Sequence, residues 1–299
     1  MTLLLLALMG CSKPQTTAVD LPDTTPVEEP TRIVAFGDVH GDATAARAAL
    51  QLAGVLNDAD AWIGGTTQVV QIGDQLDRGD NEQEILDLFD TLRTEANAAG
   101  GAFYPLLGNH EIMNIELDFR YVTEGGFADF ADTPYDETDP LIQQYPDAEK
   151  GRAAAFRPGG PYATLLSAHH VTLQLEDSLF VHGGILPAHV EYGLDAINEE
   201  TREWMRAGGT IPDIMNDSDA PTWSRHYSDD TDEDDCALLD TVLSATGASR
   251  IVVAHTVQDG INSACGDRIW RVDVGMAAYY GGSTQVLEIV GGGVQVLAR

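Results

Sequence analysis

The sequence predicts an α/β fold in which two β-sheets pack face to face and helices cover both outer surfaces, an α/β/β/α layering. In the first half of the chain, short apolar runs alternate with amphipathic stretches of helical length, which is the pattern of βαβ units. In the second half, further apolar runs follow one another more closely. Most runs end at Gly, Asp or His, so we expect each strand to finish in a sharp turn.

Seven apolar runs have the length of buried strands. They are residues 32–36 (RIVAF), 68–72 (QVVQI), 103–107 (FYPLL), 179–181, 251–254, 269–274 and 285–290. Two helices are expected between the first three strands, over residues 43–53 and 81–99. In the second of these helices, Ile85, Leu88 and Leu92 recur at helical spacing and therefore share one face.

Composition excludes several classes of function. The 299 residues include 16 Lys+Arg against 48 Asp+Glu, a formal net charge of −32. A surface this acidic repels nucleic acid and anionic lipid headgroups, so we expect no nucleic-acid partner. No apolar stretch reaches the ~20 residues of a membrane-spanning helix. The hydrophobic content of 43% is sufficient for a folded core.

The N-terminus resembles a bacterial lipoprotein signal. Residues 3–9 form a short apolar run that leads to Cys11, where the signal would be cleaved and the cysteine lipidated. Ser12 directly after the cysteine points to retention in the outer membrane. The resemblance predicts an extracytoplasmic lipoprotein on the periplasmic face that contacts the membrane only through its lipid anchor. The alternative is an ordinary cysteine in a frayed apolar N-terminus.

These observations divide the chain into three parts. Residues 1–10 would be the lipoprotein signal peptide. Residues 11–31 would be the lipidated cysteine and a disordered tether, because the segment is rich in Thr, Pro and acidic residues and almost lacks apolar ones. Residues 32–299 would form one folded domain.

Five predicted strands end in side chains of the types that bind metals. The blocks are residues 37–42 (GDVHGD), 73–79 (GDQLDRG), 108–111 (GNHE), 182–184 (HGG) and His255. One block alone would most often be a turn or a hydrogen-bonded core histidine. In open α/β sheets, however, the carboxyl ends of strands converge on one crevice. The side chains that can meet there are Asp38, His40, Asp74, Asn109, His182 and His255.

This set of blocks resembles the calcineurin-like metallophosphoesterases, and within them the phosphoprotein phosphatases. The likeness runs from about residue 32 to about residue 282. Residues 108–122, 151–162 and 261–275 are in addition similar to the Shewanella-like protein phosphatases. The resemblance implies a metallophosphatase-type β-sandwich flanked by helices, which agrees with the layering expected from the strand pattern.

The resemblance also implies two divalent metal ions. The first would be bound by Asp38 and His40, the second by Asn109, His182 and His255, with Asp74 bridging both. Carboxylates, imidazoles and an amide oxygen suit Mn, Fe or Zn rather than a thiolate-binding metal. Two such cations less two carboxylate charges leave a site of about +2 for a phosphate dianion. A hydroxide shared by the metals would be the nucleophile, so no side-chain nucleophile is required.

The same resemblance assigns the catalytic side chains. His110 would protonate the leaving-group oxygen as general acid, and Asp77 would orient that histidine. Arg78 would bind phosphate oxygens and stabilise the charge of the transition state. Arg225 stands where the family places a second phosphate-binding arginine.

The expected function is therefore metal-dependent hydrolysis of phosphomonoesters. The substrate would be a phosphorylated protein or peptide, on Ser/Thr or Tyr, and a small phosphomonoester is a second candidate. A nucleotide or diadenosine-polyphosphate hydrolase is the alternative enzyme, because related folds use the same blocks. A catalytically dead binding lipoprotein is disfavoured, since every implied ligand and His110 are present.

Two cysteines remain if Cys11 is acylated. Cys236 and Cys265 would then form an even pair in an oxidising compartment, where thiols tend to join. A bridge would attach the helical segment 237–246 to the chain just beyond the loop of His255. The alternative is two buried free thiols, because cysteine packs well as a small apolar residue.

Overall fold

Two five-stranded sheets form the centre of this computed structural model, which describes residues 31–298. The first sheet has the strand order β10-β9-β1-β2-β3, and the second has the order β4-β5-β6-β8-β7. The strands are β1 (Arg32–Phe36), β2 (Gln68–Gln71), β3 (Ala102–Pro105), β4 (Thr172–Leu175), β5 (Ser178–Val181), β6 (Arg250–Val253), β7 (Asn262–Ala264), β8 (Ile269–Arg271), β9 (Gln285–Val290) and β10 (Gly293–Ala298).

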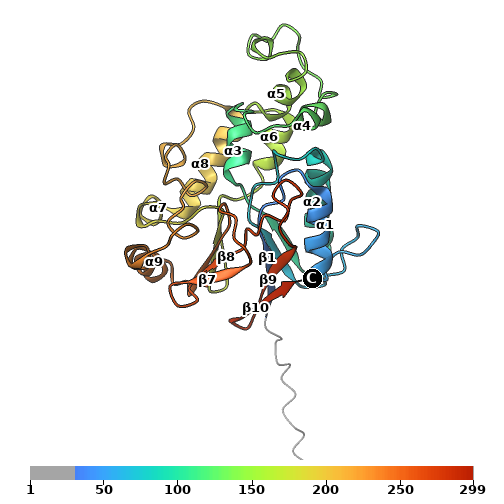
Figure 1. Cartoon of the computed structure of the whole chain (residues 1–299). Coiled ribbons are helices and arrows are strands. Elements are labelled where there is room, and N and C mark those ends of the chain that lie inside the picture. The colour runs from blue at the N-terminus through green and yellow to red at the C-terminus, as the bar shows by residue number, and fades with distance from the viewer. Residues whose placement is uncertain (1–30, 299) are drawn as a thin grey trace, which may run out of the picture. The chain divides into compact units, whose positions relative to one another are not determined.

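The helices cover the outer faces of the sheets and one end of the strands (Figure 1). The α-helices are α1 (Ala43–Leu52), α2 (Glu82–Ala98), α3 (Asn109–Ile115), α4 (Glu124–Asp129), α5 (Lys150–Phe156), α6 (Pro161–Leu166), α7 (Pro187–Tyr192), α8 (Leu194–Ala207) and α9 (Glu233–Thr246). Two short 3₁₀ helices complete the set, η1 (Ile142–Gln144) and η2 (Asp213–Met215).

The alternation of side chains along β1 accounts for the layering. Val34 and Phe36 point to one face of the sheet, where they pack with the apolar faces of α1 and α2. Ile33 and Ala35 point to the other face and pack against the second sheet. Because successive side chains of a strand point to opposite faces of the sheet, β1 contributes to two apolar layers. The α/β/β/α layering predicted from the sequence is confirmed.

The second sheet repeats this arrangement on its own outer face. Leu179 and Val181 of β5 pack with Leu239 and Val242 of α9. Phe180, between them in sequence, faces the first sheet. The two sheets therefore share one apolar layer, and each has a second layer under its own helices.

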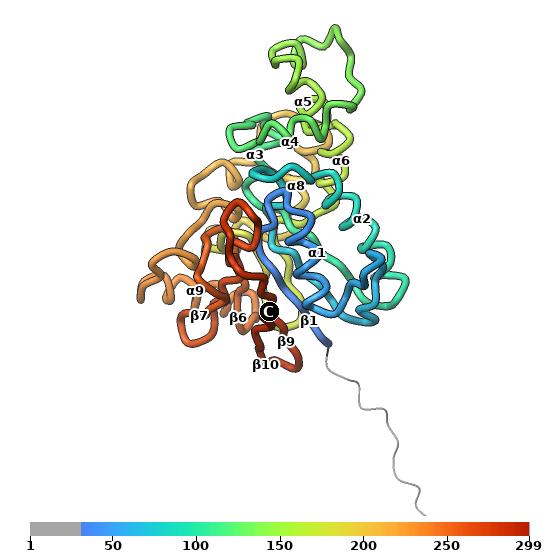
Figure 2. Tube along the Cα trace, turned by 45° about the vertical axis from the view of Figure 1, so that its right-hand side comes forward, coloured from blue at the N-terminus to red at the C-terminus, as the bar shows by residue number. Residues whose placement is uncertain are grey.

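Strand direction brings the loops after six strands to the same end of the sandwich. In the first sheet, β1, β2 and β3 are parallel neighbours. In the second sheet, β5, β6 and β8 are parallel neighbours. Helices α3 to α6 and α8 lie beyond the carboxyl ends of these strands, and the segment between α4 and α5 extends furthest from the sheets (Figures 1 and 2).

The sequence pattern did not predict β4, β7 and β10. Strand β7 has the sequence NSA, and β10 is a half-exposed edge strand, so neither has the apolar run that marks a buried strand. Strand β8 ends at Arg271 rather than at residue 274, and beyond Val272 the backbone bonds to the loop after β6, where the N–H of Gln258 donates to the carbonyl oxygen of Asp273. The helices after α2 were also not predicted individually, apart from the segment now seen as α9.

The expectations for the N-terminal signal peptide, for lipidation of Cys11 and for the tether lie outside the described residues. Within residues 31–298, no helix combines the length and apolar character needed to cross a bilayer.

A disulfide joins Cys236 in α9 to Cys265, the residue that follows β7. The two Cα atoms are 5.5 Å apart, and 29 positions separate the residues in sequence. The bridge thus connects the outer helix layer to the second sheet, as the sequence predicted. Closing a loop of this length lowers the entropy of the unfolded chain.

Reduction of this bridge should lower the free energy of unfolding by about 3–4 kcal/mol, the loop-closure value for a loop of roughly 30 residues. Urea denaturation with and without reductant measures the change. Cys236→Ser is the control, because its stability should not respond to reductant. In a Cys11→Ser background, two titratable thiols in the unreduced, denatured chain would contradict the bridge.

Candidate metal centre and active site

The six side chains predicted to bind metal lie together at the carboxyl ends of the parallel strands. Asp38 and His40 follow β1, Asp74 follows β2, and Asn109 begins α3 after β3. His182 and His255 follow β5 and β6 in the second sheet. Five of the six are buried to at least 97%, and His255 is half-buried. The site is thus built by both sheets, as expected from strand direction.

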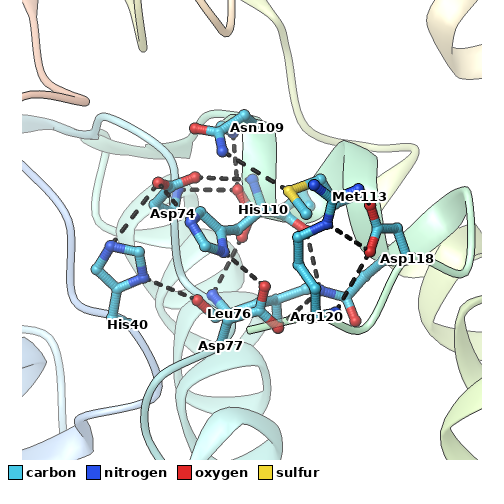
Figure 3. A network of polar contacts seen from close by, with 12 residues as sticks. His40, Asp74, Leu76, Asp77, Asn109, His110, Met113, Asp118 and Arg120 are labelled. Atoms are coloured by element: carbon cyan, nitrogen blue, oxygen red, sulfur yellow. Dashed lines mark hydrogen bonds and ion pairs between the residues drawn. The ribbon is translucent and has the colours of Figure 1, made fainter. Parts of the chain in front are cut away.

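Asp74 faces histidines on more than one side, and Figure 3 shows it between His40 and His110. Its Oδ2 lies 3.2 Å from Nε2 of His182, 3.8 Å from Nε2 of His40 and 3.8 Å from Nε2 of His110. Burial alone would raise the pKa of Asp74, but the surrounding histidines hold it well below its usual range. The carboxylate is therefore ionised at neutral pH.

Asp38 and His255 complete the cluster. Oδ2 of Asp38 lies 3.7 Å from Nε2 of His40, and its Oδ1 lies 3.9 Å from Nδ1 of His182. Nδ1 of His255 lies 3.2 Å from Nε2 of His182. Two groups of three residues have donor atoms that all lie within 4.8 Å of one another and could hold a metal ion. Asp74 belongs to both groups: His40, Asp74 and His110; Asp74, His182 and His255.

Hydrogen bonds to backbone carbonyls orient two of the histidines. Nδ1 of His40 donates to the carbonyl oxygen of Leu76 at 3.0 Å, and Nδ1 of His182 donates to that of Ile72 at 2.7 Å. Both rings therefore turn the lone pair of Nε2 toward Asp74. Metal-binding histidines in proteins are commonly fixed in this way.

The atoms that meet around His182 are mostly acceptors. Nε2 of His182 lies 3.0 Å from Oδ1 of Asn109 and 3.2 Å from Oδ2 of Asp74. Oδ1 of Asp38 and Nε2 of His255 are buried and have no hydrogen-bond partner in the described part of the chain. Buried polar atoms rarely lack a partner. A cation among these acceptors would satisfy them, so the residues fit a divalent metal ion.

For two of the histidines, burial also favours the neutral form that metal binding requires. It lowers the pKa of His40 to about 4 and, with the help of His182, that of His255 to about 2. Both imidazoles are therefore neutral at pH 7 and can donate a lone pair. Burial, together with the negative charges of Asp273 and Asp74, raises the pKa of Asp38 well above its usual range. A bound cation would reverse that shift.

His110 and Asp77 form a buried pair beside the cluster. Nδ1 of His110 donates to Oδ2 of Asp77 at 2.5 Å, while its Nε2 faces Asp74. Burial opposes the charged imidazole, but Asp74 and Asp77 raise the pKa of His110 above its ordinary value. The ring is thus oriented by a carboxylate at one nitrogen, with the other nitrogen directed into the site.

Backbone strain is concentrated at the site. Asp74, Asp77, Arg78 and His255 have left-handed φ values of 54°, 67°, 66° and 69°, and His40 has φ of 40°. Residues other than glycine seldom adopt this conformation, which persists only where the surrounding structure imposes it.

Glu111 is a residue that the sequence-based assignment of roles missed, although it ends the GNHE block. It is fully buried in α3 and accepts hydrogen bonds from four backbone N–H groups. Three of these belong to consecutive residues, Asp74, Gln75 and Leu76, and the fourth belongs to Gly108. Glu111 therefore holds the strained loop that positions Asp74.

Asp273 was also missed. It follows β8 at the same end of the sandwich, 99% buried, and its negative charge contributes to the raised pKa of Asp38. A Cβ atom on Gly37 would lie 2.7 Å from Cα of Asp273, so only glycine allows this approach. The other site residues follow the carboxyl ends of parallel strands. The same criterion applied to β8 would have identified Asp273.

Arg78 stands at the opening of the site between tyrosine rings. Its guanidinium carbon lies 4.7 Å from the ring centre of Tyr121, 5.1 Å from that of Tyr279 and 5.4 Å from that of Tyr280. No carboxylate of residues 31–298 lies within ion-pair distance of it, and its Nε is buried without a partner. The rings therefore fix a guanidinium whose donors are available to an anion.

Arg225 lies beside the loop of His255, where its Nη1 donates to Oγ1 of Thr256 at 2.6 Å. Thr256 directly follows His255, so this arginine borders the metal cluster. It also lines a cavity of about 460 Å³ together with Trp223 and His226.

Comparison with known proteins gives the family. The calcineurin-like phosphoesterase model matches residues 31–259. Shewanella-like protein phosphatase 2 of Arabidopsis thaliana is 40% identical, over 89% of this chain and 76% of the relative. Shewanella-like protein phosphatase 1 of Plasmodium berghei is 26% identical, over 83% of this chain and 68% of the relative.

A solved structure shows the same fold. The cold-active protein tyrosine phosphatase of a psychrophilic Shewanella species has a TM-score of 0.71 and 24% identity, covering 90% of this chain and 80% of that one. The family match extends over most of the described residues, and the buried cluster has the ligand types that a metal-dependent phosphoesterase requires. The chain therefore belongs to the calcineurin-like phosphoesterase family, similar to the Shewanella-like protein phosphatases, and is a metal-dependent phosphoric ester hydrolase.

Proposed function

We propose that the protein is a phosphoprotein phosphatase that binds two divalent metal ions and removes phosphate from a side chain of a protein or peptide. The observation that carries the proposal is the position of Asp74, whose Oδ2 faces His40 of the first sheet at 3.8 Å and His182 of the second sheet at 3.2 Å. A carboxylate shared in this way is the arrangement of dinuclear centres. The names of the relatives support a phosphorylated protein as substrate.

The residues proposed to hold the metals divide between the two sheets. Asp38 and His40 of the first sheet would hold one ion, Asn109, His182 and His255 would complete the second, and Asp74 would contact both. When bound, the two cations activate water and neutralise phosphate oxygens as Lewis acids. The donor types suit Mn, Fe or Zn.

Arg78 binds and orients the phosphate in this proposal. Its guanidinium has no carboxylate partner among residues 31–298, so its planar donors can pair with two phosphate oxygens. The tyrosine rings around it restrict its motion before substrate arrives, which reduces the entropy lost on binding. A cavity of about 730 Å³ lined by Arg78, His40, Thr123 and Tyr279 opens beside it, large enough for a phosphorylated side chain.

His110 holds the proton for the leaving group. Because its Nδ1–H is bound to Asp77, the proton to be transferred lies on Nε2, the nitrogen that faces Asp74. An alkoxide or phenolate leaves more readily when it is protonated as the ester bond breaks. Asp77 keeps the ring in the required orientation.

Removal of metal should abolish activity. After treatment with a chelator, hydrolysis of phosphopeptides should fall to background, and Mn²⁺ should restore it. The assay measures phosphate release from phosphotyrosine and phosphoserine peptides, with mononucleotides and a dinucleoside polyphosphate as comparison substrates. Faster turnover of the nucleotides than of every peptide would contradict the assignment to protein substrates.

His110→Asn should lower kcat by about 10²-fold or more, because the general acid is lost. The bound metal, measured by elemental analysis, should stay close to the wild-type amount. His170→Asn is the control, since this half-buried histidine lines a cavity that contains none of the site residues and should leave kcat unchanged. Loss of one metal ion from His110→Asn would instead identify His110 as a ligand.

Arg78→Ala should raise the inhibition constant of inorganic phosphate by about 10-fold or more, the effect of losing a charge-assisted hydrogen bond. Arg120→Ala is the matched control, because among residues 31–298 this exposed arginine pairs with Asp118 alone. An inhibition constant that Arg78→Ala leaves unchanged would remove Arg78 from the phosphate site.

A further inference from the structure

Arg152 of α5 is a fully buried arginine that the proposed mechanism does not use. Its exposed fraction is 0%, and it is one of the largest completely buried side chains in the described part of the chain. Burying a guanidinium is costly unless charged partners and hydrogen bonds compensate it. Its contacts lead directly to Asp77, the carboxylate that orients His110.

One oxygen of Asp77 is occupied by groups from two helices. Nη2 of Arg152 donates to Oδ1 of Asp77 at 3.2 Å, and Nδ2 of Asn114 donates to the same oxygen at 2.9 Å. Nε of Arg152 also donates to Oδ1 of Asn114 at 2.9 Å, so the amide cannot turn over. These contacts leave Oδ2 of Asp77 for His110 and fix the plane of the carboxylate.

The arginine also holds the backbone at Asp77, through Glu82 at the start of α2. Oε1 of Glu82 accepts from Nη2 of Arg152 at 3.1 Å and from the backbone N–H of Asp77 at 2.5 Å. Nη1 of Arg152 pairs with the other oxygen of Glu82 and donates to the carbonyl oxygen of Gly126 at 2.9 Å. Both the side chain and the left-handed backbone of Asp77 are thus held by the same ion pair.

Aromatic rings keep water away from this ion pair. The guanidinium carbon lies 4.9 Å from the ring centre of Phe156, 5.0 Å from that of Phe130 and 5.9 Å from that of Phe119. In such surroundings charge interactions are stronger than in water, and the guanidinium gains cation–π contacts. Arg152 therefore compensates two buried carboxylates, those of Asp77 and Glu82, in a place where solvent cannot.

We propose that Arg152 is a positioning residue for general acid catalysis, acting on His110 through the carboxylate of Asp77. This inference rests on the proposed function, in which His110 protonates the leaving group. Helix α5, which lies beyond the ends of the strands, thereby contributes to catalysis without touching the substrate. Loss of Arg152 should leave the imidazole misdirected while the metal ligands stay in place.

Leaving-group dependence separates this role from a merely structural one. Dinitrophenolate departs without a proton, whereas the oxygen of a phenyl or alkyl ester needs one. In Arg152→Gln, kcat for phenyl phosphate should fall by about 10-fold or more, while kcat for dinitrophenyl phosphate falls by less than about 3-fold. KM for both esters and the metal content should stay near wild type, because Arg152 contacts neither the bound phosphate ester nor a residue proposed to bind metal.

Three further variants complete the experiment. Arg157→Gln is the matched control: it removes an arginine–aspartate pair with Asp139 next to the same helix, and should lower kcat for both esters equally or not at all. Arg152→Lys should recover part of the phenyl phosphate activity. If Arg152→Gln does not fold, Arg152→Gln/Glu82→Gln removes two opposite charges together and keeps the net charge of the cluster, while Asp77 still loses its cationic partner.

The outcomes are distinct. The proposal is overturned if folded Arg152 variants lose the same factor on both esters, or if Arg157→Gln reproduces their leaving-group dependence. His110→Asn reports on the proposed function in the same assay. If His110→Asn shows no greater loss on phenyl phosphate than on dinitrophenyl phosphate, the general acid assignment itself fails. If it shows that greater loss and the Arg152 variants do not, only the role of Arg152 fails.

Discussion

The structure depends on one buried carboxylate, Asp74, that faces three imidazoles. In water an isolated aspartate would be solvated; here burial would neutralise it if the histidines did not favour its charge. The same oxygen faces ligands from both sheets. The packing of the two sheets, the strained loops and the acceptor-rich cluster therefore all meet at Asp74. Two cations can be held here as proposed only if the carboxylate of Asp74 keeps its position.

Residues outside the ligand cluster hold the loop that carries this carboxylate. Glu111 accepts the backbone N–H of Asp74 and of the two residues after it. Asp77, which lies further along the same loop, is held by Arg152 and Glu82. Since these partners lie in α2, α3 and α5, the helices at the ends of the strands also serve the site. Buried hydrogen bonds and one buried ion pair thus hold this loop, and fixed supporting groups are the condition for precise placement of catalytic side chains.

The strongly acidic surface makes the local charge of the site important. With a net charge of −32, the protein repels a phosphate dianion at long range. Arg78 counters this locally, because tyrosine rings rather than carboxylates surround its guanidinium. An ion pair at this position would have consumed the charge that an anionic substrate needs.

Much of the fold and the set of candidate ligands could be predicted from the sequence. Apolar runs identify β1, β2 and β5 because buried strands are continuous and short, and glycine-flanked Asp and His residues identify their ends. The short strand β7 and the half-exposed edge strand β10 lack such a run, so pattern alone could not find them.

The supporting residues were harder to predict for a different reason. Arg152 and Asp273 act through partners far away in sequence, and nothing local distinguishes them from a surface arginine or a turn aspartate. Glu111 stood inside a recognised block, but its role depends on backbone N–H groups about 35 positions earlier. Long-range contacts of this kind become visible only in three dimensions.

The most direct test of the shared role of Asp74 is the number of metal ions per chain in three proteins. Elemental analysis of the wild type, reconstituted with Mn²⁺ and freed of excess ion, should give two ions per chain. His255→Ala should retain one ion, because the ligands supplied by the first sheet remain. Asp74→Asn should retain almost none, because both groups lose their common carboxylate. A folded Asp74→Asn variant that still binds two ions would contradict the account.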